Sequence, residues 1–197
     1  IEGIDWLAAR HGAEVRRAVE SLTTQAMNGQ VPLESVYDRR LAVIGANADD
    51  LKALSAAYEA AVAPGAADAI AALHAAGVTV HVVSGGLRPA LLPMTRALGI
   101  ADDRVHAVKP VADASGRFTH AAPSPLTTQS GKHAIIAALC LPRPILGVGD
   151  GATDLAMRPA VDAFAAYTGF VHRDAVVARA ALVLDSFAAL VAHVLSA

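Results

Sequence analysis

The sequence predicts an α/β protein: a parallel sheet with helices on both faces, preceded by a small helical domain. Residues 1–62 show only helical periodicity, whereas from Pro64 onward short apolar runs alternate with helical segments. Two of the apolar runs end in glycine-rich turns with polar side chains, as is typical of parallel strands whose carboxyl ends face a ligand. We therefore expect a helical domain over 1–62 and an α/β domain over 63–197.

The helical domain is predicted from apolar residues that recur three and four positions apart. Such sets occur around Leu7, Val19 and Leu54, and Asn28-Gly29 followed by Pro32 separates two of the helices. No segment of this part has the alternation of a strand. We interpret it as a small helical cap.

The rest of the chain alternates strands with helices, which predicts right-handed crossovers between parallel strands. Residues 117–119 are expected to form a hairpin with strand 105–108 across the turn 113–116. The expected strands are 78–83, 105–108, 144–148, 161–166 and 181–184. The expected helices are 65–76, 87–98, 132–139, 153–158, 172–179 and 186–195.

The segment from Gly149 to Asp154, Gly-Asp-Gly-Ala-Thr-Asp, is the most informative in the chain. It follows the apolar run 144–148, so Asp150 and Asp154 come at the carboxyl end of a predicted buried strand. Paired carboxylates there suit a hard cation such as Mg²⁺, which prefers oxygen ligands and shares them with a substrate phosphate. The alternative is an N-cap Asp beside a surface Asp.

Two further segments could bind an anion. Ser84-Gly85-Gly86 ends the run 78–83 before a predicted helix, where a hydroxyl and free N–H groups can hold a phosphate. A plain strand-to-helix turn with a serine cap would have the same sequence. Lys132 opens another helix and could place its charge on a phosphate, or could be an exposed first-turn lysine.

These three segments, in this order, resemble the motifs of the haloacid dehalogenase (HAD) superfamily of phosphatases, and more closely its phosphoserine phosphatase family. The similarity extends over nearly the whole chain. It implies a C1-type helical cap and a HAD-type, Rossmann-like core. The segment 149–154 is specific to the superfamily by itself. The segments at Ser84 and Lys132 support the resemblance mainly through their order and spacing.

The resemblance implies a Mg²⁺-dependent phosphatase that works through an aspartyl-phosphate intermediate. Asp150 would bind Mg²⁺ directly, and Asp154 would hold a metal-bound water or orient Lys132. The implied catalytic residues are Ser84, Lys132, Asp150 and Asp154, with both aspartates assigned to the metal. The implied phosphate and substrate contacts are Ser84, Gly85, Gly86, Lys132, Gly151 and Thr153.

The resemblance also implies an amino acid as the alcohol part of the substrate, namely O-phospho-L-serine. Glu2 matches the family position that accepts the ammonium, and Arg40 matches the one that grips the carboxylate. Met27 matches a residue that shields the site, and Leu33 stands where the family often has Phe. Without the resemblance, Glu2 would be read as part of a frayed terminus, Arg40 as an exposed helix arginine, and Met27 as a residue that fills the core.

One motif of the family, Asp-x-Asp-x-Thr/Ser, does not occur in these 197 residues. It carries the nucleophilic Asp, the acid/base Asp and the first core strand, so we expect it in a segment upstream of Ile1. If the natural protein lacks it, the chain would be an inactive homologue with a binding or regulatory role. A phosphatase for another small phosphomonoester is a further alternative.

Composition limits the other function classes. The formal net charge of −2 argues against a nucleic-acid module, and no apolar run has the length of a membrane span. The single cysteine, Cys140, excludes an internal disulfide framework and is compatible with a cytoplasmic protein. Its apolar neighbours predict a buried, inert thiol.

Overall fold

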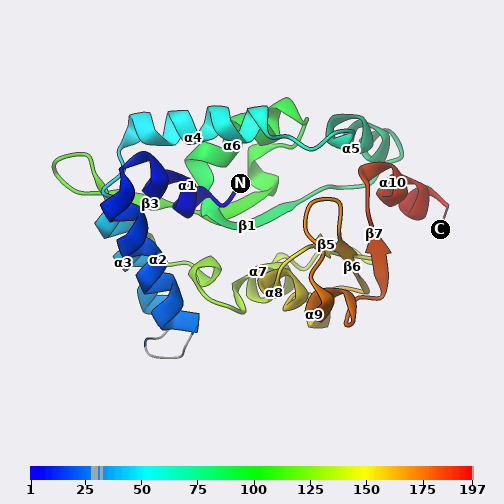
Figure 1. Ribbon diagram of the computed structural model, residues 1–197. Helices are drawn as coiled ribbons and strands as arrows, with labels where there is room; N and C mark the ends of the chain where they lie inside the picture. The colour runs from blue at the N-terminus through cyan, green and yellow to red at the C-terminus, as the bar shows by residue number, and fades with distance from the viewer. Residues whose placement is uncertain (28–30, 32, 197) are drawn as a thin grey trace. The chain divides into compact units, whose positions relative to one another are not determined.

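The computed structural model describes residues 1–27, 31 and 33–196 (Figure 1). Contacts within the chain divide it into two compact units. The first unit is Ile1–Val62 with Val82–Thr128, and the second unit is Ala63–His81 with Gln129–Ala197. The predicted domain boundary at 62/63 coincides with one of these divisions, but Val82–Thr128 packs with the helical part. The assignment of a cap and a core therefore remains a prediction.

Four helices begin the first unit, as the periodicity predicted: α1 (Gly3–Arg10), α2 (Ala13–Met27), α3 (Leu33–Ile44) and α4 (Ala48–Ala60). Among the described residues no strand lies in this part. The apolar face of each helix is buried. The side chains with no exposed surface in this part are Leu7, Val19, Val36, Leu41 and Leu54.

Helix α4 begins at a capping box that also fastens the end of α1. The Asn47 side chain accepts hydrogen bonds from the amides of Asp49 and Asp50, and the Asp50 carboxylate accepts one from the Asn47 amide. The same carboxylate pairs with Arg10 and His11, both at 3.0 Å. Asp50 is only 8% exposed, so one acidic side chain joins two helix termini.

In the first unit the predicted strand 105–108 is confirmed, whereas the predicted strand 78–83 differs from the structure. Strand β1 runs from Val82 to Leu87, not over 78–83, and pairs in parallel with β2 (Val105–Val108). The pairing starts only at Val82, opposite Val105, and it continues past the serine through a bulge. Helix α6 (Arg88–Ala97) follows directly.

The predicted hairpin exists, but its partner strand was wrong. Strand β4 (Phe118–Ala121) pairs with β3 (Pro110–Ala112) rather than with 105–108. The turn at 113–116 is confirmed, because the Asp113 carboxylate accepts from the Ser115 and Arg117 amides. Two short 3₁₀ helices, η1 (Asp102–Arg104) and η2 (Pro125–Thr127), complete the unit.

The second unit contains a parallel sheet in the order β5 (Leu146–Gly149), β6 (Ala163–Tyr167), β7 (Leu182–Leu184). Each strand overlaps its predicted segment. Phe164 and Ala165, on the central strand, are at most 2% exposed. The helical segments are α5 (Ala66–Ala75), α7 (Gly131–Leu139), α8 (Ala152–Leu155), η3 (Arg158–Ala160), α9 (Asp174–Val177) and α10 (Phe187–Leu195).

Cys140 is exposed, so the prediction of a buried thiol was wrong. It is the C-cap residue of α7 and has a left-handed backbone, with φ of 47°. The chain turns away at this point, so the cysteine leaves the buried side that its apolar neighbours indicated.

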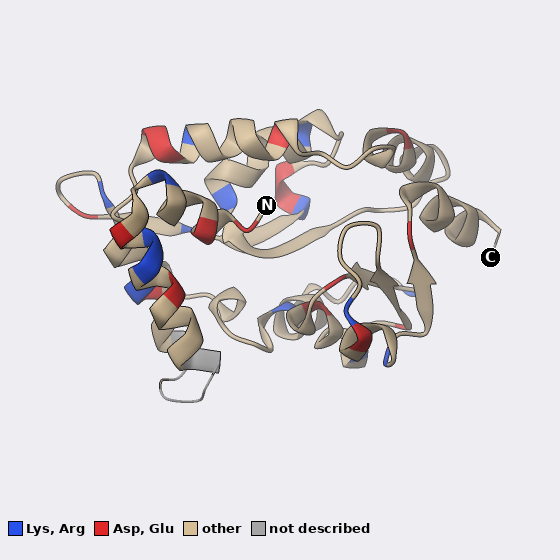
Figure 2. Cartoon of the chain, viewed as in Figure 1, with Lys and Arg blue, Asp and Glu red and all other residues tan. Residues whose placement is uncertain are grey.

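Acidic and basic side chains are interspersed on helices and loops of both units (Figure 2). Across the described part of the chain, no helix combines the length and apolar character needed to cross a membrane.

Candidate active site

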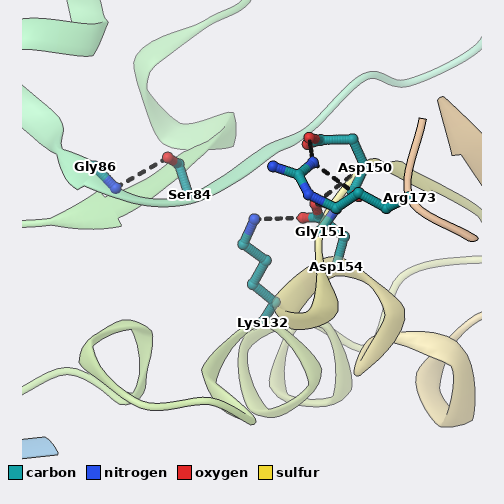
Figure 3. A network of polar contacts seen from close by, with 7 residues as sticks. All are labelled: Ser84, Gly86, Lys132, Asp150, Gly151, Asp154 and Arg173. Carbon is teal, nitrogen blue, oxygen red and sulfur yellow. Dashed lines mark hydrogen bonds and ion pairs between the residues drawn. The ribbon is translucent and has the colours of Figure 1, made fainter. Parts of the chain in front are cut away.

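In the second unit, Asp154 lies at the centre of a hydrogen-bond network beyond strand β5 (Figure 3). Its Oδ2 accepts hydrogen bonds from the amides of Asp150 (3.0 Å) and Gly151 (2.9 Å). Its Oδ1 accepts from the Nζ of Lys132. Asp154 is 8% exposed, and both carboxylate oxygens are engaged, so it organises the turn and the lysine.

The turn before α8 needs glycine at position 149. A Cβ added there would come within 2.3 Å of the Asp154 side chain, closer than any real contact. Glycine therefore allows the carboxylate to fold back under the turn and to reach the two amides. This is the physical reason for glycine at position 149.

Lys132 stands in the first turn of α7 and extends its ammonium group to Asp154. The side chains of the pair are only 17% and 12% exposed. Because the pair is largely removed from water, the carboxylate holds the ammonium group in one place. A fixed ammonium group can neutralise charge that develops on a phosphoryl group.

Asp150 presents its side chain on the other side of the turn, where it meets Arg173. The Nη1 of Arg173 donates to Asp150 Oδ2, and also to the Asp150 carbonyl oxygen at 3.1 Å. Both side chains are nearly half exposed, at 43% and 48%. Arg173 is not among the residues predicted from the sequence. The available signal was a basic residue in the loop after β6, because β5 and β6 are parallel and their carboxyl ends share one edge of the sheet.

The residues present fit a Mg²⁺ ion only in part. Asp154 has no free carboxylate oxygen, whereas Asp150 can offer one to a cation. Within the described ranges, no three His, Cys, Asp or Glu side chains form a group that could hold a metal by themselves. Mg²⁺ commonly binds one or two carboxylates and takes water and substrate phosphate as its other ligands, and Asp150 fits that pattern.

Gly151 and Thr153 lie in the same turn, at the start of α8. The Gly151 amide is used by Asp154. Contacts of these two residues with a substrate remain predictions.

In the first unit, Ser84, Gly85 and Gly86 form the bulge of strand β1. Ser84 is opposite Ala107 and Leu87 is opposite Val108, so the two glycines have no counterpart on β2. The Gly86 amide donates to the Ser84 Oγ at 3.0 Å, which fixes the hydroxyl over the bulge (Figure 3).

Arg40 lies on α3 in the first unit, with its guanidinium 5.8 Å from the centre of the Tyr37 ring. Its Nη1 reaches the hydroxyl of Thr23 at 3.5 Å. Its Nε is buried, and no partner for it is found in the described part of the chain. A half-buried guanidinium suits a carboxylate, which accepts two parallel hydrogen bonds from the arginine fork.

Glu2 is exposed and is the N-cap residue of α1. Tyr58 packs beside it, because a Cβ on Gly3 would lie 2.2 Å from the Tyr58 hydroxyl. Burial, and next the charge of Glu2, raise the pKa of Tyr58 to about 12. The same hydroxyl would lie 3.6 Å from a Cβ on Gly86, so Tyr58 connects the Glu2 end of α1 with the bulge.

The structure thus brings the predicted residues together in two sets. Lys132, Asp150, Gly151, Thr153 and Asp154 lie around one turn of the second unit. In the first unit, Tyr37 and Tyr58 link Arg40 and Glu2 to the bulge. Met27 ends α2, but the side chains of Met27 and Leu33 fall outside the described residues.

Comparison with known proteins gives one family and a consistent set of relatives. A family model for haloacid dehalogenase-like hydrolases matches residues 4–159. The phosphoserine phosphatase of Bos taurus is 32% identical over 179 residues, covering 89% of this chain and 79% of its own length. The chloroplastic phosphoserine phosphatase of Arabidopsis thaliana is 31% identical over 196 residues, covering 96% of this chain and 66% of its own length.

Solved structures are similar in fold. A phosphoserine phosphohydrolase-like protein from Francisella tularensis matches 92% of this chain and 86% of its own, with a TM-score of 0.75 and 22% identity. The predicted α/β class is confirmed by this likeness.

Proposed function

We propose, since the chain belongs to the haloacid dehalogenase-like hydrolases and within them to the phosphoserine phosphatases, that it hydrolyses O-phospho-L-serine to L-serine and phosphate with Mg²⁺. The observation that carries this proposal is the part-buried Lys132–Asp154 pair, which the Asp150 amide joins, in a chain whose curated relatives are named phosphoserine phosphatases. We also propose a role in L-serine biosynthesis, in the cytoplasm, with which the single cysteine is compatible.

The residues of the second unit would supply the positive charge that neutralises the phosphoryl group. Mg²⁺, when bound, would neutralise charge on the phosphoryl oxygens. Asp150 would supply a carboxylate ligand to it, and Asp154 would keep Lys132 extended. The lysine would then face the negative charge that builds up during transfer.

The residues of the first unit would bind the ester itself. The Ser84 hydroxyl and the amide of Gly85 would donate to phosphoryl oxygens. The Asp nucleophile and the Asp that exchanges protons with the leaving oxygen would come from the family's motif Asp-x-Asp-x-Thr/Ser, which these 197 residues do not contain. An attack by that nucleophile would form an aspartyl phosphate, which water then hydrolyses.

Arg40 and Glu2 would select the amino acid. The guanidinium of Arg40 would donate to the substrate carboxylate, while Glu2 would accept from the ammonium group. A phosphomonoester without a carboxylate would gain nothing from Arg40. This difference separates phosphoserine from other small phosphomonoesters.

The test uses the full-length natural protein and steady-state kinetics with phosphoserine. We expect Arg40→Ala to raise KM about tenfold or more, because a charged hydrogen bond to the substrate is lost. Arg39→Ala is the matched control, since Arg39 is the exposed neighbour on the same helix. Asp150→Asn should abolish turnover. Equal KM values for Arg40→Ala and Arg39→Ala would show that Arg40 does not bind the substrate carboxylate and would overturn its proposed role.

A further inference from the structure

Tyr37 joins the helix that carries Arg40 to the bulge that carries Ser84. It lies one turn before Arg40 on α3 and is 5% exposed. Its hydroxyl donates to the carbonyl oxygen of Gly85 at 2.7 Å, across 48 positions of sequence. Both partners belong to the first unit.

The Gly85 carbonyl is open to a side chain because the bulge removes it from the ladder. The strand pairing passes from Ser84 directly to Leu87, so Gly85 has no counterpart on β2. A carbonyl that leaves the ladder in a part-buried place needs another donor. Burial raises the pKa of Tyr37, so the phenol keeps its proton and remains that donor.

The hydrogen bond of Tyr37 reaches Ser84 through a single peptide group. The carbonyl of Gly85 and the amide of Gly86 belong to one planar unit and point in opposite directions. The Gly86 amide donates to the Ser84 Oγ at 3.0 Å. Holding the carbonyl therefore also aims the amide, and the amide aims the serine oxygen. Accepting this bond leaves the serine O–H to donate.

We propose that Tyr37 is a positioning residue for both ends of the substrate. Its hydroxyl orients the Gly85–Gly86 peptide group and, through it, the Ser84 hydroxyl that would bind the phosphoryl group. Its ring supports the guanidinium of Arg40, 5.8 Å from the ring centre, which would bind the carboxylate. The roles of Ser84 and Arg40 rest on the proposed function, whereas the orientation of the bulge by Tyr37 does not.

The first test measures the bulge without any substrate. Amide hydrogen exchange by NMR on the full-length protein should show the Gly86 amide exchanging about tenfold faster in Tyr37→Phe, the factor expected for one lost hydrogen bond. Amides of α3 report in the same spectra whether the helix stays folded. Tyr58→Phe removes another buried phenol hydroxyl near the bulge, and it should change Gly86 exchange less than about twofold. Unchanged Gly86 exchange in Tyr37→Phe would overturn the proposal.

The second test separates the hydroxyl from the ring by kinetics with phosphoserine. Tyr37→Phe should lower kcat about tenfold and leave KM within about twofold, because only the phosphoryl end is disturbed. Tyr37→Leu also removes the ring and should raise KM in addition. A rise of KM in Tyr37→Phe with unchanged kcat would contradict the assignment. If the wild-type protein does not hydrolyse phosphoserine, the proposed function fails, and the exchange measurement alone decides whether Tyr37 orients the bulge.

Discussion

Arg173 and Asp150 form the most exposed contact of the candidate active site. The guanidinium donates to Asp150 Oδ2, one of the two carboxylate oxygens with which Asp150 could bind a cation. It also donates to the Asp150 carbonyl oxygen, so it holds the residue at two points. The pair is nearly half exposed, and water therefore weakens the attraction between its charges.

We expect Arg173→Met to bind divalent cations more tightly. Mg²⁺ must compete with the guanidinium for Asp150, and an exposed ion pair of this kind is worth about 0.2–1 kcal/mol, or up to about fivefold in affinity. Mn²⁺ binding followed by electron paramagnetic resonance would measure the change directly. Arg179→Met, at an exposed arginine of the same unit, is the control. Weaker Mn²⁺ binding in Arg173→Met would show that the arginine supports the metal instead.

Gly149 shows a different kind of requirement at the same turn. Its place is dictated by the Asp154 side chain, which fills the space of a Cβ. A substitution by Ala would push the carboxylate away from the Asp150 and Gly151 amides. We expect Gly149→Ala to lower kcat at least as much as Asp154→Asn does, because it disturbs the same hydrogen bonds, and steady-state kinetics of both variants would check this.

At the scale of elements, the junction of α1 and α4 depends on Asp50. Burial raises the pKa of this carboxyl, but hydrogen bonds from the Asn47 amide, Arg10 and His11 outweigh burial and lower the pKa below its ordinary 3.8. A depressed folded-state pKa stabilises the fold above the unfolded-state pKa. That contribution is lost as the pH falls through the folded-state pKa.

We expect Asp50→Asn to reduce the free energy of unfolding by about 1–2 kcal/mol at pH 7, because it weakens a helix cap and removes a charge shared by two side chains. The difference from wild type should shrink as the pH falls from the ordinary pKa of 3.8 through the lower folded-state pKa, where Asp50 of the wild type becomes protonated. Urea unfolding of the variant and of wild type, at pH 7 and in acid, measures the difference in the free energy of unfolding. Asp49→Asn is the control, since Asp49 is exposed and pairs only with Lys52 among the described contacts. A difference that grows in acid would contradict this explanation.

At the scale of the whole molecule, the chain forms two compact units. In the second unit, Phe164 is 2% exposed on the central strand, and it packs beside Gly147, where a Cβ would lie 3.5 Å from its ring. The cavity left by a smaller side chain would lie at the middle of this three-stranded sheet.

Phe164→Ala should lower the free energy of unfolding by about 3–5 kcal/mol, through lost burial and the cavity that remains. Val183→Ala, on the same sheet but 52% exposed, should change it by less than about 0.5 kcal/mol. Thermal unfolding measures the change in the overall free energy of unfolding. Hydrogen exchange should show the largest loss of protection in β5, β6 and β7. Equal loss of protection in α1–α4 would mean that the two units unfold as one.

Much of the element order could be predicted, because periodicity is a local property. Helical spacing located α1 to α4, and apolar runs located β5, β6 and β7. The error at β1 came from the bulge, since the extension from Ser84 to Leu87 depends on pairing with β2. The hairpin partner of β4 was misassigned for the same reason, because strand pairing involves residues far apart in sequence.

The sequence by itself determined the chemistry of the Gly149–Asp154 turn, since a tight turn with two carboxylates depends on residues within six positions of one another. The tertiary structure alone decided which side chains meet these groups: Arg173 at Asp150, Lys132 at Asp154 and Tyr37 at Gly85. Those contacts span 23, 22 and 48 positions, and no local pattern encodes a distance of that kind. Packing of the folded chain decides which of these residues, far apart in sequence, come into contact.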